Sequence, residues 1–265
     1  MKTPKILDGL ELAGFIKERQ RIQVAGMKKK PTLLIVRDSD NPVILKYVNL
    51  KIRYGEDIGI KVIDKKAEEP KYVRGIIKEA NRDDGIDGII LQLPIIEKEC
   101  TDEITSFIVP EKDVDGLSGQ GNYDSATATA ILWLLSGYGI ELKDKNIALV
   151  GRGKLVGAPL YRICQDSKYH VEMFHRGSDL TKLKNFDIVI TATGQPGLIL
   201  SEYVRPGAVV VDAGTASEGG VLKGDLAPEV RERMDLLAIT PEIGGVGPLT
   251  ITCLFDHVIE ACARK

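Results

Sequence analysis

The sequence contains little of what marks several common classes of protein. Its four cysteines lie far apart and form no C-x-x-C pair, which indicates reduced thiols rather than a disulfide framework or a zinc site. Its three histidines show no spacing typical of a metal site. Aromatic residues make up only 5% of the 265 residues and are not interleaved with basic ones, and the formal net charge is −2. We therefore expect no bound metal and no general attraction to nucleic acid or to an anionic membrane.

Long apolar runs are also missing. No stretch approaches the roughly 20 apolar residues that span a membrane. The beginning, Met1-Lys-Thr-Pro-Lys5, lacks the apolar core of a signal peptide. Together with the cysteine pattern, these absences predict a cytoplasmic protein, and its length allows one large or two medium-sized domains.

The first half of the chain alternates helical patterns with short apolar runs. Asn41 followed by Pro42 is a typical helix start, and Gly59 is a typical helix end. Such alternation predicts an α/β domain with a mostly parallel sheet, in which ligands bind at the carboxyl ends of the strands. The predicted helices cover residues 7–27, 42–57 and 73–80, and the predicted strands lie within residues 31–36, 60–63 and 85–93.

A glycine-rich turn follows a predicted buried strand at Asn146–Val150. Gly151 and Gly153 permit a tight turn, and Gly157 permits close packing of the next helix on the strand. The amino end of that helix favours an anion such as a pyrophosphate. The spacing G-x-G-x-x-x-G is one residue longer than the usual dinucleotide motif. Further strands are predicted over residues 171–175, 186–190 and 208–212, and a final helix over residues 249–264.

The end of the strand 171–175 indicates which dinucleotide binds. A carboxylate at this tip normally accepts from the ribose 2′-hydroxyl of NAD. Here the tip reads His175-Arg176-Gly177-Ser178 and has no acid. Arg152, Arg176 and Ser178 could instead hold a 2′-phosphate, which favours NADP. The alternative is that both arginines are simply solvated.

Two features of the first half could carry chemistry. Tyr47 and Lys51 are four residues apart and share one face of the predicted helix 42–57, beside the apolar stripe of Ile44, Val48 and Ile52. A lysine at the border of an apolar face can have a lowered pKa and transfer protons. It can also be a surface lysine that only lays its stem on the apolar face. Gln92, at the end of a predicted strand, could bind a ring edge or cap a loop.

The loop Pro110-Glu-Lys-Asp-Val-Asp-Gly116 contains two acids two residues apart. Asp113 and Asp115 could bind a cation, but no further ligand spacing accompanies them. One of them could instead hold a polar heterocycle, and a solvated turn is the third possibility.

Six segments closely resemble the bifunctional methylenetetrahydrofolate dehydrogenase/cyclohydrolase family, in order along nearly the whole chain. The Asp-Val-Asp-Gly loop and the string Gly244-Gly-Val-Gly-Pro-Leu-Thr250 are the most specific. The segments are Tyr47-Val-x-x-Lys51, Gln92-Leu-Pro94, Lys112-Asp-Val-Asp-Gly116, Val150-Gly-Arg152 with Val156-Gly-x-Pro159, Thr191-Ala-Thr-Gly194, and Pro241 with Gly244-Gly-Val-Gly-Pro248.

This resemblance implies two domains, each a mostly parallel sheet with helices on both faces. Residues 1–123, joined by the C-terminal helix 249–265, are expected to bind the folate, and residues 124–248 to form a Rossmann-type domain that binds NADP. A homodimer through the Rossmann domain is also expected. The implied reactions are NADP-dependent oxidation of methylenetetrahydrofolate and hydrolysis of the methenyl product to formyltetrahydrofolate. They belong to one-carbon metabolism, which serves purine and amino-acid biosynthesis.

The resemblance also assigns roles to residues. Lys51 matches the catalytic lysine, Tyr47 a tyrosine that stacks on the substrate, and Gln92 a glutamine that assists the lysine. Asp115 matches the acid that grips the pterin. Gly245 and Pro248 are expected to contact the substrate, although their segment could be a plain loop. The expected cofactor-binding residues are Gly151, Arg152, Gly153, Val156, Gly157, His175, Arg176, Ser178, Thr193 and Gly194.

The chain departs from the family pattern at four places. Ile44 replaces a usual serine near the lysine, and Gly153 replaces a common serine near the cofactor. Ser125–Ala130 and Glu242-Ile243 replace proline-containing strings. These changes leave open an enzyme with dehydrogenase activity only, or a non-catalytic folate- or dinucleotide-binding protein. A shikimate-type dehydrogenase, another two-domain Rossmann enzyme, would lack the two most specific strings.

Overall fold

The computed structural model describes residues 3–218 and 221–265, which form two compact units. The three-stranded unit consists of Gly14–Ala126 and Ile251–Lys265. The six-stranded unit consists of the chain up to Ala13 together with Thr127–Thr250. The sequence placed residues 1–13 in the folate domain instead. Residues 3–13 belong to the six-stranded unit, in which β1 (Lys5–Ile6) pairs with β11 (Ala238–Ile239).

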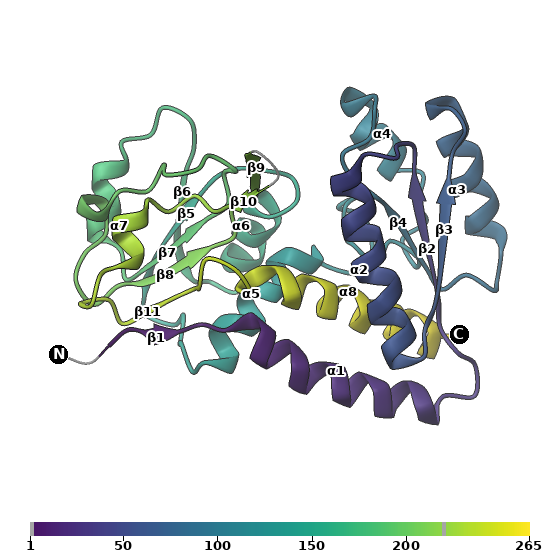
Figure 1. The fold of residues 1–265 in the computed structure, drawn as a ribbon, viewed down its shortest axis with the longest axis horizontal. Coiled ribbons are helices and arrows are strands. Elements are labelled where there is room, and N and C mark those ends of the chain that lie inside the picture. Colours follow the sequence, from purple (N-terminus) through teal and green to yellow (C-terminus); the bar gives the residue numbers. More distant parts are fainter. Residues whose placement is uncertain (1–2, 219–220) are drawn as a thin grey trace. The chain divides into compact units, whose positions relative to one another are not determined.

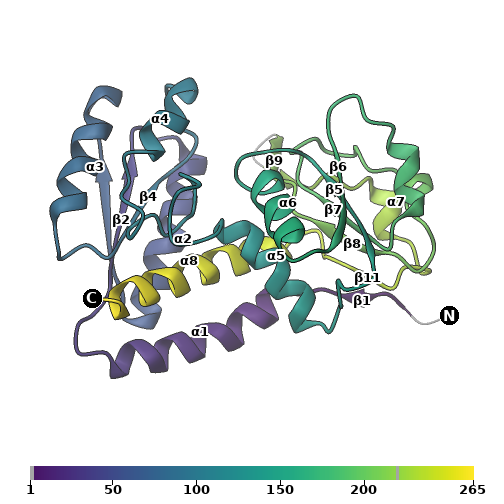
Figure 2. The same ribbon diagram turned by 180° about the vertical axis from the view of Figure 1, so that it is seen from behind.

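The three-stranded unit has a small parallel sheet in the order β3-β2-β4. Its strands are β2 (Thr32–Arg37), β3 (Lys61–Lys66) and β4 (Gly88–Leu91). The helices α2 (Pro42–Ile58) and α3 (Val73–Arg82) lie on opposite sides of these strands in both views (Figures 1 and 2). All four residues of β4 are buried, as expected for a strand covered on both faces.

Local signals set the ends of α2. The Asn41 side chain accepts a hydrogen bond from the Val43 backbone N–H (2.9 Å), and Pro42 occupies the first turn. Gly59 ends the helix with φ +82°, and its N–H donates to the Glu56 carbonyl. Both predicted ends of the helix are therefore confirmed.

The six-stranded unit has a parallel sheet in the order β1-β11-β8-β7-β5-β6. The chain leaves β5 for β6 on one side and then returns to β7 on the other. This reversal is the switch point at which dinucleotides bind in Rossmann-type sheets, and it confirms the predicted fold class. The further strands are β5 (Asn146–Val150), β6 (His170–Phe174), β7 (Ile188–Thr191) and β8 (Val209–Asp212).

Helices cover both faces of this sheet. Figures 1 and 2 show α6 (Gly157–Asp166) and α7 (Pro228–Arg231) on opposite sides of the strands. Val150, Phe174, Val189 and Val210 belong to one apolar core cluster of the unit. An antiparallel pair, β9 (Ala216–Glu218) and β10 (Val221–Lys223), follows β8.

The C-terminal helix, α8 (Val246–Ala263), is longer than predicted. It begins three residues before the predicted start, so Gly247 and Pro248 lie in its first turn. It is long and apolar enough to cross a membrane, but most of it is buried in the protein and it carries Asp256 and Glu260. The others are α1 (Gly9–Gly26), α4 (Thr101–Thr105), α5 (Ala126–Gly137), and the short 3-10 helices η1 (Pro70–Tyr72), η2 (Lys98–Cys100), η3 (Leu180–Asn185) and η4 (Ser201–Tyr203).

Candidate active site

Lys51 and Gln92 form a direct contact in the three-stranded unit. The Lys51 ammonium donates to Gln92 Oε1 over 2.7 Å. Gln92 follows β4, and its backbone N–H continues the sheet by donating to the Val36 carbonyl. Its amide nitrogen donates to the Leu93 carbonyl (3.0 Å), which turns the amide oxygen toward the lysine. The glutamine is buried, so its position is well defined.

Burial lowers the pKa of Lys51, and the negative charge of Asp115 opposes that shift. Gln92 accepts a hydrogen bond but carries no charge, so it orients the ammonium without holding it protonated as a carboxylate would. This geometry favours proton transfer over a surface lysine that extends its ammonium into solvent. Of the two sequence alternatives for Gln92, the amide nitrogen makes the loop contact, with the Leu93 carbonyl. The binding of a ring edge stays a prediction.

Asp115 lies in the loop that follows α4 and interacts electrostatically with Lys51. Burial raises the pKa of its carboxyl, Lys51 and His257 lower it, and Asp113 raises it further. The next residue, Gly116, has φ +67°, and a Cβ there would lie 2.6 Å from the backbone of Asp124. A glycine is therefore needed beside Asp115, and the tight turn fixes where this acid lies.

Asp113 has a structural role in the same loop. It is fully buried, and its carboxylate accepts from the backbone N–H groups of Leu117 (3.2 Å) and Ser118 (2.9 Å) and from the Ser118 hydroxyl. Its oxygens are thus occupied by their own loop rather than available to a cation. Within the described residues, no three acidic, cysteine or histidine side chains gather as metal ligands would.

Tyr47 lies one turn before Lys51 on α2 and is half-buried. Burial raises the pKa of its phenol, so the ring stays neutral across the physiological range. Ile44 and Val48 on the neighbouring stripe are buried as predicted, whereas Ile52 is only partly buried. The residue that replaces the usual serine, Ile44, is thus part of the core.

The three glycines of the turn after β5 differ in how much space a Cβ atom would have. Gly151 has φ +111°, and a Cβ there would lie 2.4 Å from the Ala192 carbonyl oxygen. A Cβ on Gly157 would lie 1.9 Å from the Gly151 carbonyl oxygen. Gly153, in contrast, faces open space. The first and third glycines are therefore required by packing, and the second only leaves the backbone accessible.

The start of α6 is suited to an anion. Val156 occupies the N-cap position, and its side chain makes no capping hydrogen bond. A helix start without a side-chain cap leaves backbone N–H groups for a ligand, and the helix dipole favours a negative charge there. The cradle formed by Gly151, Val156 and Gly157 therefore fits a pyrophosphate.

The tip of β6 is a tight turn. The Ser178 hydroxyl accepts from the His175 N–H (2.9 Å), the Ser178 N–H donates to the His175 carbonyl (2.9 Å), and Gly177 has φ +90°. Ser178 can still donate its hydroxyl hydrogen. Arg152 and Arg176 are exposed, and neither has an ion-pair partner within the described residues. Both guanidinium groups can therefore meet a phosphate.

The loop after β7 carries Thr193 and Gly194. The Thr193 backbone N–H donates to Asp225 Oδ2 over 2.7 Å, and Gly194 has φ +65°. Sequence reasoning missed Asp225, because a single acid about 30 residues away has no spacing that links it to this loop.

The glycine-rich loop before α8 is packed tightly within the six-stranded unit. Gly244 has φ +88°, and its carbonyl accepts from the Leu10 N–H (3.1 Å). A Cβ on Gly9 would lie 1.7 Å from the Gly245 carbonyl oxygen. Gly245 and Pro248 thus belong to this unit, whereas the lysine, its glutamine, Tyr47 and Asp115 belong to the three-stranded unit.

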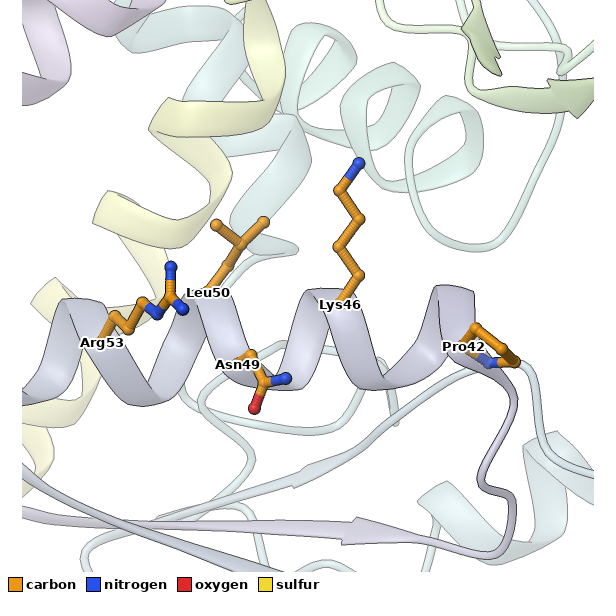
Figure 3. A pocket seen from close by; sticks show the side chains of 5 residues that line it. All are labelled: Pro42, Lys46, Asn49, Leu50 and Arg53. Carbon is orange, nitrogen blue, oxygen red and sulfur yellow. The ribbon is translucent and has the colours of Figure 1, made fainter. Parts of the chain in front are cut away.

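Two surface depressions lie away from these residues. One is on α2 and is lined by Pro42, Lys46, Asn49, Leu50 and Arg53 (Figure 3). The other is lined by Leu200, Ser201, Glu202 and Glu229. Neither contains a predicted site residue.

Family models and curated relatives match both halves of the chain. The family model described as "Tetrahydrofolate dehydrogenase/cyclohydrolase, catalytic domain" matches residues 7–115, and the corresponding "NAD(P)-binding domain" model matches residues 125–265. A curated relative, "Bifunctional protein FolD" of Staphylococcus carnosus, is 35% identical over 97% of this chain and 96% of its own.

Solved structures are similar over the whole chain. The bifunctional enzyme FolD, methylenetetrahydrofolate dehydrogenase/cyclohydrolase, from Campylobacter jejuni has a TM-score of 0.92 at 29% identity, over 98% of this chain and 99% of its own. The corresponding enzyme of Trypanosoma brucei, complexed with NADP cofactor and inhibitor, has a TM-score of 0.90 at 26% identity, over 100% and 99%.

Proposed function

Because the chain belongs to the tetrahydrofolate dehydrogenase/cyclohydrolase family, we propose that it oxidises methylenetetrahydrofolate with NADP and hydrolyses the methenyl product to formyltetrahydrofolate. Its matched segments span both the catalytic and the NAD(P)-binding model. The observation that carries the catalytic part is the hydrogen bond between Lys51 and the buried Gln92.

Lys51 moves protons in the hydrolysis. Water attacks the one-carbon bridge of the methenyl cation, and the neutral amine of Lys51 accepts a proton from that water. When the carbon–nitrogen bond of the ring opens, Lys51 returns that proton to the leaving nitrogen. The remaining hydroxyl proton of the intermediate passes to solvent as the formyl carbonyl forms, so the reaction releases one proton overall. Burial lowers the lysine pKa, so more of the amine is neutral near physiological pH. Gln92 orients the amine throughout by accepting its hydrogen bond.

Tyr47 and Asp115 hold the folate. The half-buried ring of Tyr47 offers a flat apolar surface one turn from the lysine, on which a pterin can stack. Asp115 accepts hydrogen bonds from the amino and N–H groups of the pterin. The rigid turn at Gly116 keeps this carboxyl in place.

The six-stranded unit binds NADP, which accepts the hydride from the one-carbon bridge. Gly151 and Gly157 leave room for its pyrophosphate at the start of α6. Arg152 and Arg176 pair with the 2′-phosphate, since no acid at the tip of β6 repels it. Thr193 and Gly194 contact the nicotinamide end.

We also propose that the enzyme works in the cytoplasm as a homodimer and supplies one-carbon units for purine and amino-acid biosynthesis. The four cysteines are free, which suits a reducing compartment. The six-stranded sheet ends in the two-residue edge strand β1, whose Ile6 side chain is exposed, and Leu237, just before the neighbouring strand β11, is exposed as well. A second copy of the chain could cover this edge. Sedimentation of the purified chain measures whether it is a dimer.

An enzyme with dehydrogenase activity only is the second candidate. Ile44 favours it, because a buried isoleucine provides no hydroxyl near Lys51 where relatives usually have a serine. The hydrogen bond between Lys51 and Gln92 nevertheless supports hydrolysis as well, so we favour both activities.

A single assay separates these readings. The purified chain is mixed with methylenetetrahydrofolate and NADP, and both the reduced cofactor and the methenyl compound are followed. Reduced cofactor with little methenyl accumulation supports both activities. Equal amounts of the two products indicate a dehydrogenase alone, and no turnover indicates a binding protein.

A further inference from the structure

Asp225 is a fully buried carboxylate that contacts one short segment of the chain. Its Oδ2 accepts from the Thr191 hydroxyl (2.6 Å) and from the Thr193 N–H (2.7 Å). Its Oδ1 accepts from the Gln195 N–H (2.9 Å). All three donors belong to residues 191–195, at the carboxyl end of β7 and beside the switch point of the sheet.

The surrounding structure places Asp225 firmly. Its own N–H donates to Asp212 Oδ1 (3.0 Å), and Asp212 is paired with Arg231 (2.6 Å). A Cβ on Gly214 would lie 2.2 Å from the Asp225 carboxyl group, so this position must be glycine for the acid to fit. The position of the Asp225 carboxylate is therefore fixed by its neighbours on several sides.

The bonding pattern requires a carboxylate. Both oxygens of Asp225 face donors, and all three donors are neutral. An asparagine of the same shape would point its NH₂ group at one of these donors and lose that contact. Burying a carboxylate is costly unless it is hydrogen-bonded, so each of these charge-assisted bonds matters.

One consequence concerns what the loop can offer a ligand. The Thr193 N–H is turned inward to the carboxylate and is not available to a cofactor. The loop instead presents the Thr193 side chain and the backbone of Gly194, whose φ of +65° follows from the same turn. The shape of this surface therefore depends on the carboxylate beneath it.

We propose that Asp225 is a positioning residue that holds residues 191–195 in the shape that receives the nicotinamide end of NADP. This inference rests on the proposed function. The acid does not touch the cofactor, and it acts through Thr193 and Gly194.

Two variants and one control test this inference. Asp225→Asn keeps the volume and loses one acceptor, and Thr191→Val removes one donor but keeps the carboxylate. Asp187→Asn is the control, because Asp187 also accepts from a backbone N–H (Asn146, 2.8 Å) and from Arg205 (2.5 Å). Asp187 immediately precedes the same strand, β7, at its amino end, whereas the loop follows the carboxyl end.

The dissociation constant for NADP is measured by calorimetry, together with kcat and KM of the dehydrogenase. Hydrolysis of supplied methenyltetrahydrofolate is measured without any dinucleotide. We expect Asp225→Asn to raise the NADP dissociation constant and to lower dehydrogenase kcat/KM, each by roughly 10- to 100-fold. This range corresponds to the loss of one charge-assisted hydrogen bond. Thr191→Val should have a smaller effect in the same direction. Hydrolysis in both variants, and all values of Asp187→Asn, should stay within about twofold of the wild type.

Unchanged NADP binding and dehydrogenase activity in folded Asp225→Asn would overturn the inference. So would an equal loss of hydrolysis, since it would show a purely structural role. If Asp225→Asn does not fold, Thr191→Val decides by the same two criteria. A wild-type chain that binds NADP but turns over no folate would refute the proposed function, while the binding comparison would still test Asp225.

Discussion

The ammonium of Lys51 lies 2.7 Å from the amide oxygen of Gln92, and the two residues come from α2 and from the end of β4. An amide at this position orients the lysine but carries no charge, so it does not itself fix the protonation state of the ammonium. Burial disfavours the charged ammonium, and Asp115 favours it. The reactivity of the lysine therefore depends on a balance that single substitutions can shift.

Replacing the amide by an acid should move the pH dependence of hydrolysis. The base form of Lys51 is neutral, so hydrolysis rises with pH through the lysine pKa, which burial holds below its usual value. Gln92→Glu places a negative charge against the ammonium and raises that pKa. The acidic limb of kcat/KM for hydrolysis should then move upward by about one pH unit or more. An unshifted limb in a folded variant would show that this lysine is not the titrating base.

The two acids of the loop 110–116 should behave differently. Asp115→Ala should raise KM for the folate and leave NADP binding unchanged, because this acid belongs to the three-stranded unit. Asp113→Ala removes a fully buried acceptor of three hydrogen bonds, so it should lower the free energy of unfolding by about 1–3 kcal/mol or more. Substrate titrations and thermal unfolding separate the two effects. Equal loss of folate and NADP binding in Asp115→Ala would indicate misfolding instead.

The arginines near the tip of β6 should select NADP over NAD. Arg152→Ala and Arg176→Ala each remove one guanidinium that can pair with the 2′-phosphate. We expect each to weaken NADP binding by roughly 1.5–3 kcal/mol. NAD lacks this phosphate and serves as the matched control ligand, so its affinity should change little. If both variants bind NADP as tightly as the wild type, the 2′-phosphate is held elsewhere.

The glycines of the turn after β5 form a matched pair. Gly157→Ala inserts a Cβ 1.9 Å from the Gly151 carbonyl, so it should distort the turn and greatly weaken NADP binding. Gly153→Ala points into open space and should change the unfolding free energy by no more than about 0.5 kcal/mol. Thermal unfolding and NADP titration of both variants provide the measurement. A Gly157→Ala variant that binds NADP normally would contradict the described packing.

Features with local signals were predictable from the sequence. Asn41, Pro42 and Gly59 mark the ends of α2 by their own conformational preferences, and the observed helix begins and ends beside them. The sequence assigned Gly151 and Gly153 to a tight turn and Gly157 to close packing of the next helix. The structure shows that contacts of a Cβ exclude any other residue at Gly151 and Gly157, whereas Gly153 faces open space.

Features that depend on distant partners were not predictable. β1 has only two residues, and it is a strand because β11, more than 200 residues later, pairs with it. The role of Asp225 depends on the three hydrogen-bond donors at residues 191–195, which lie about 30 residues away in the sequence. The spacing of Tyr47 and Lys51 indicated a shared helix face, but the direction of the ammonium depended on where β4 placed Gln92.

The most direct test of the account is the activity of Lys51→Met. Methionine keeps an unbranched apolar stem and removes the nitrogen, so packing on α2 is largely retained. Hydride transfer needs alignment and little proton traffic, whereas hydrolysis needs a group that moves protons. Both reactions are followed in one cuvette with methylenetetrahydrofolate and NADP. We predict that hydrolysis falls by about 10²–10⁴-fold, while part of the dehydrogenase activity remains and methenyltetrahydrofolate accumulates. Full hydrolysis by a folded Lys51→Met protein would contradict the assignment of Lys51 as the proton-transfer group.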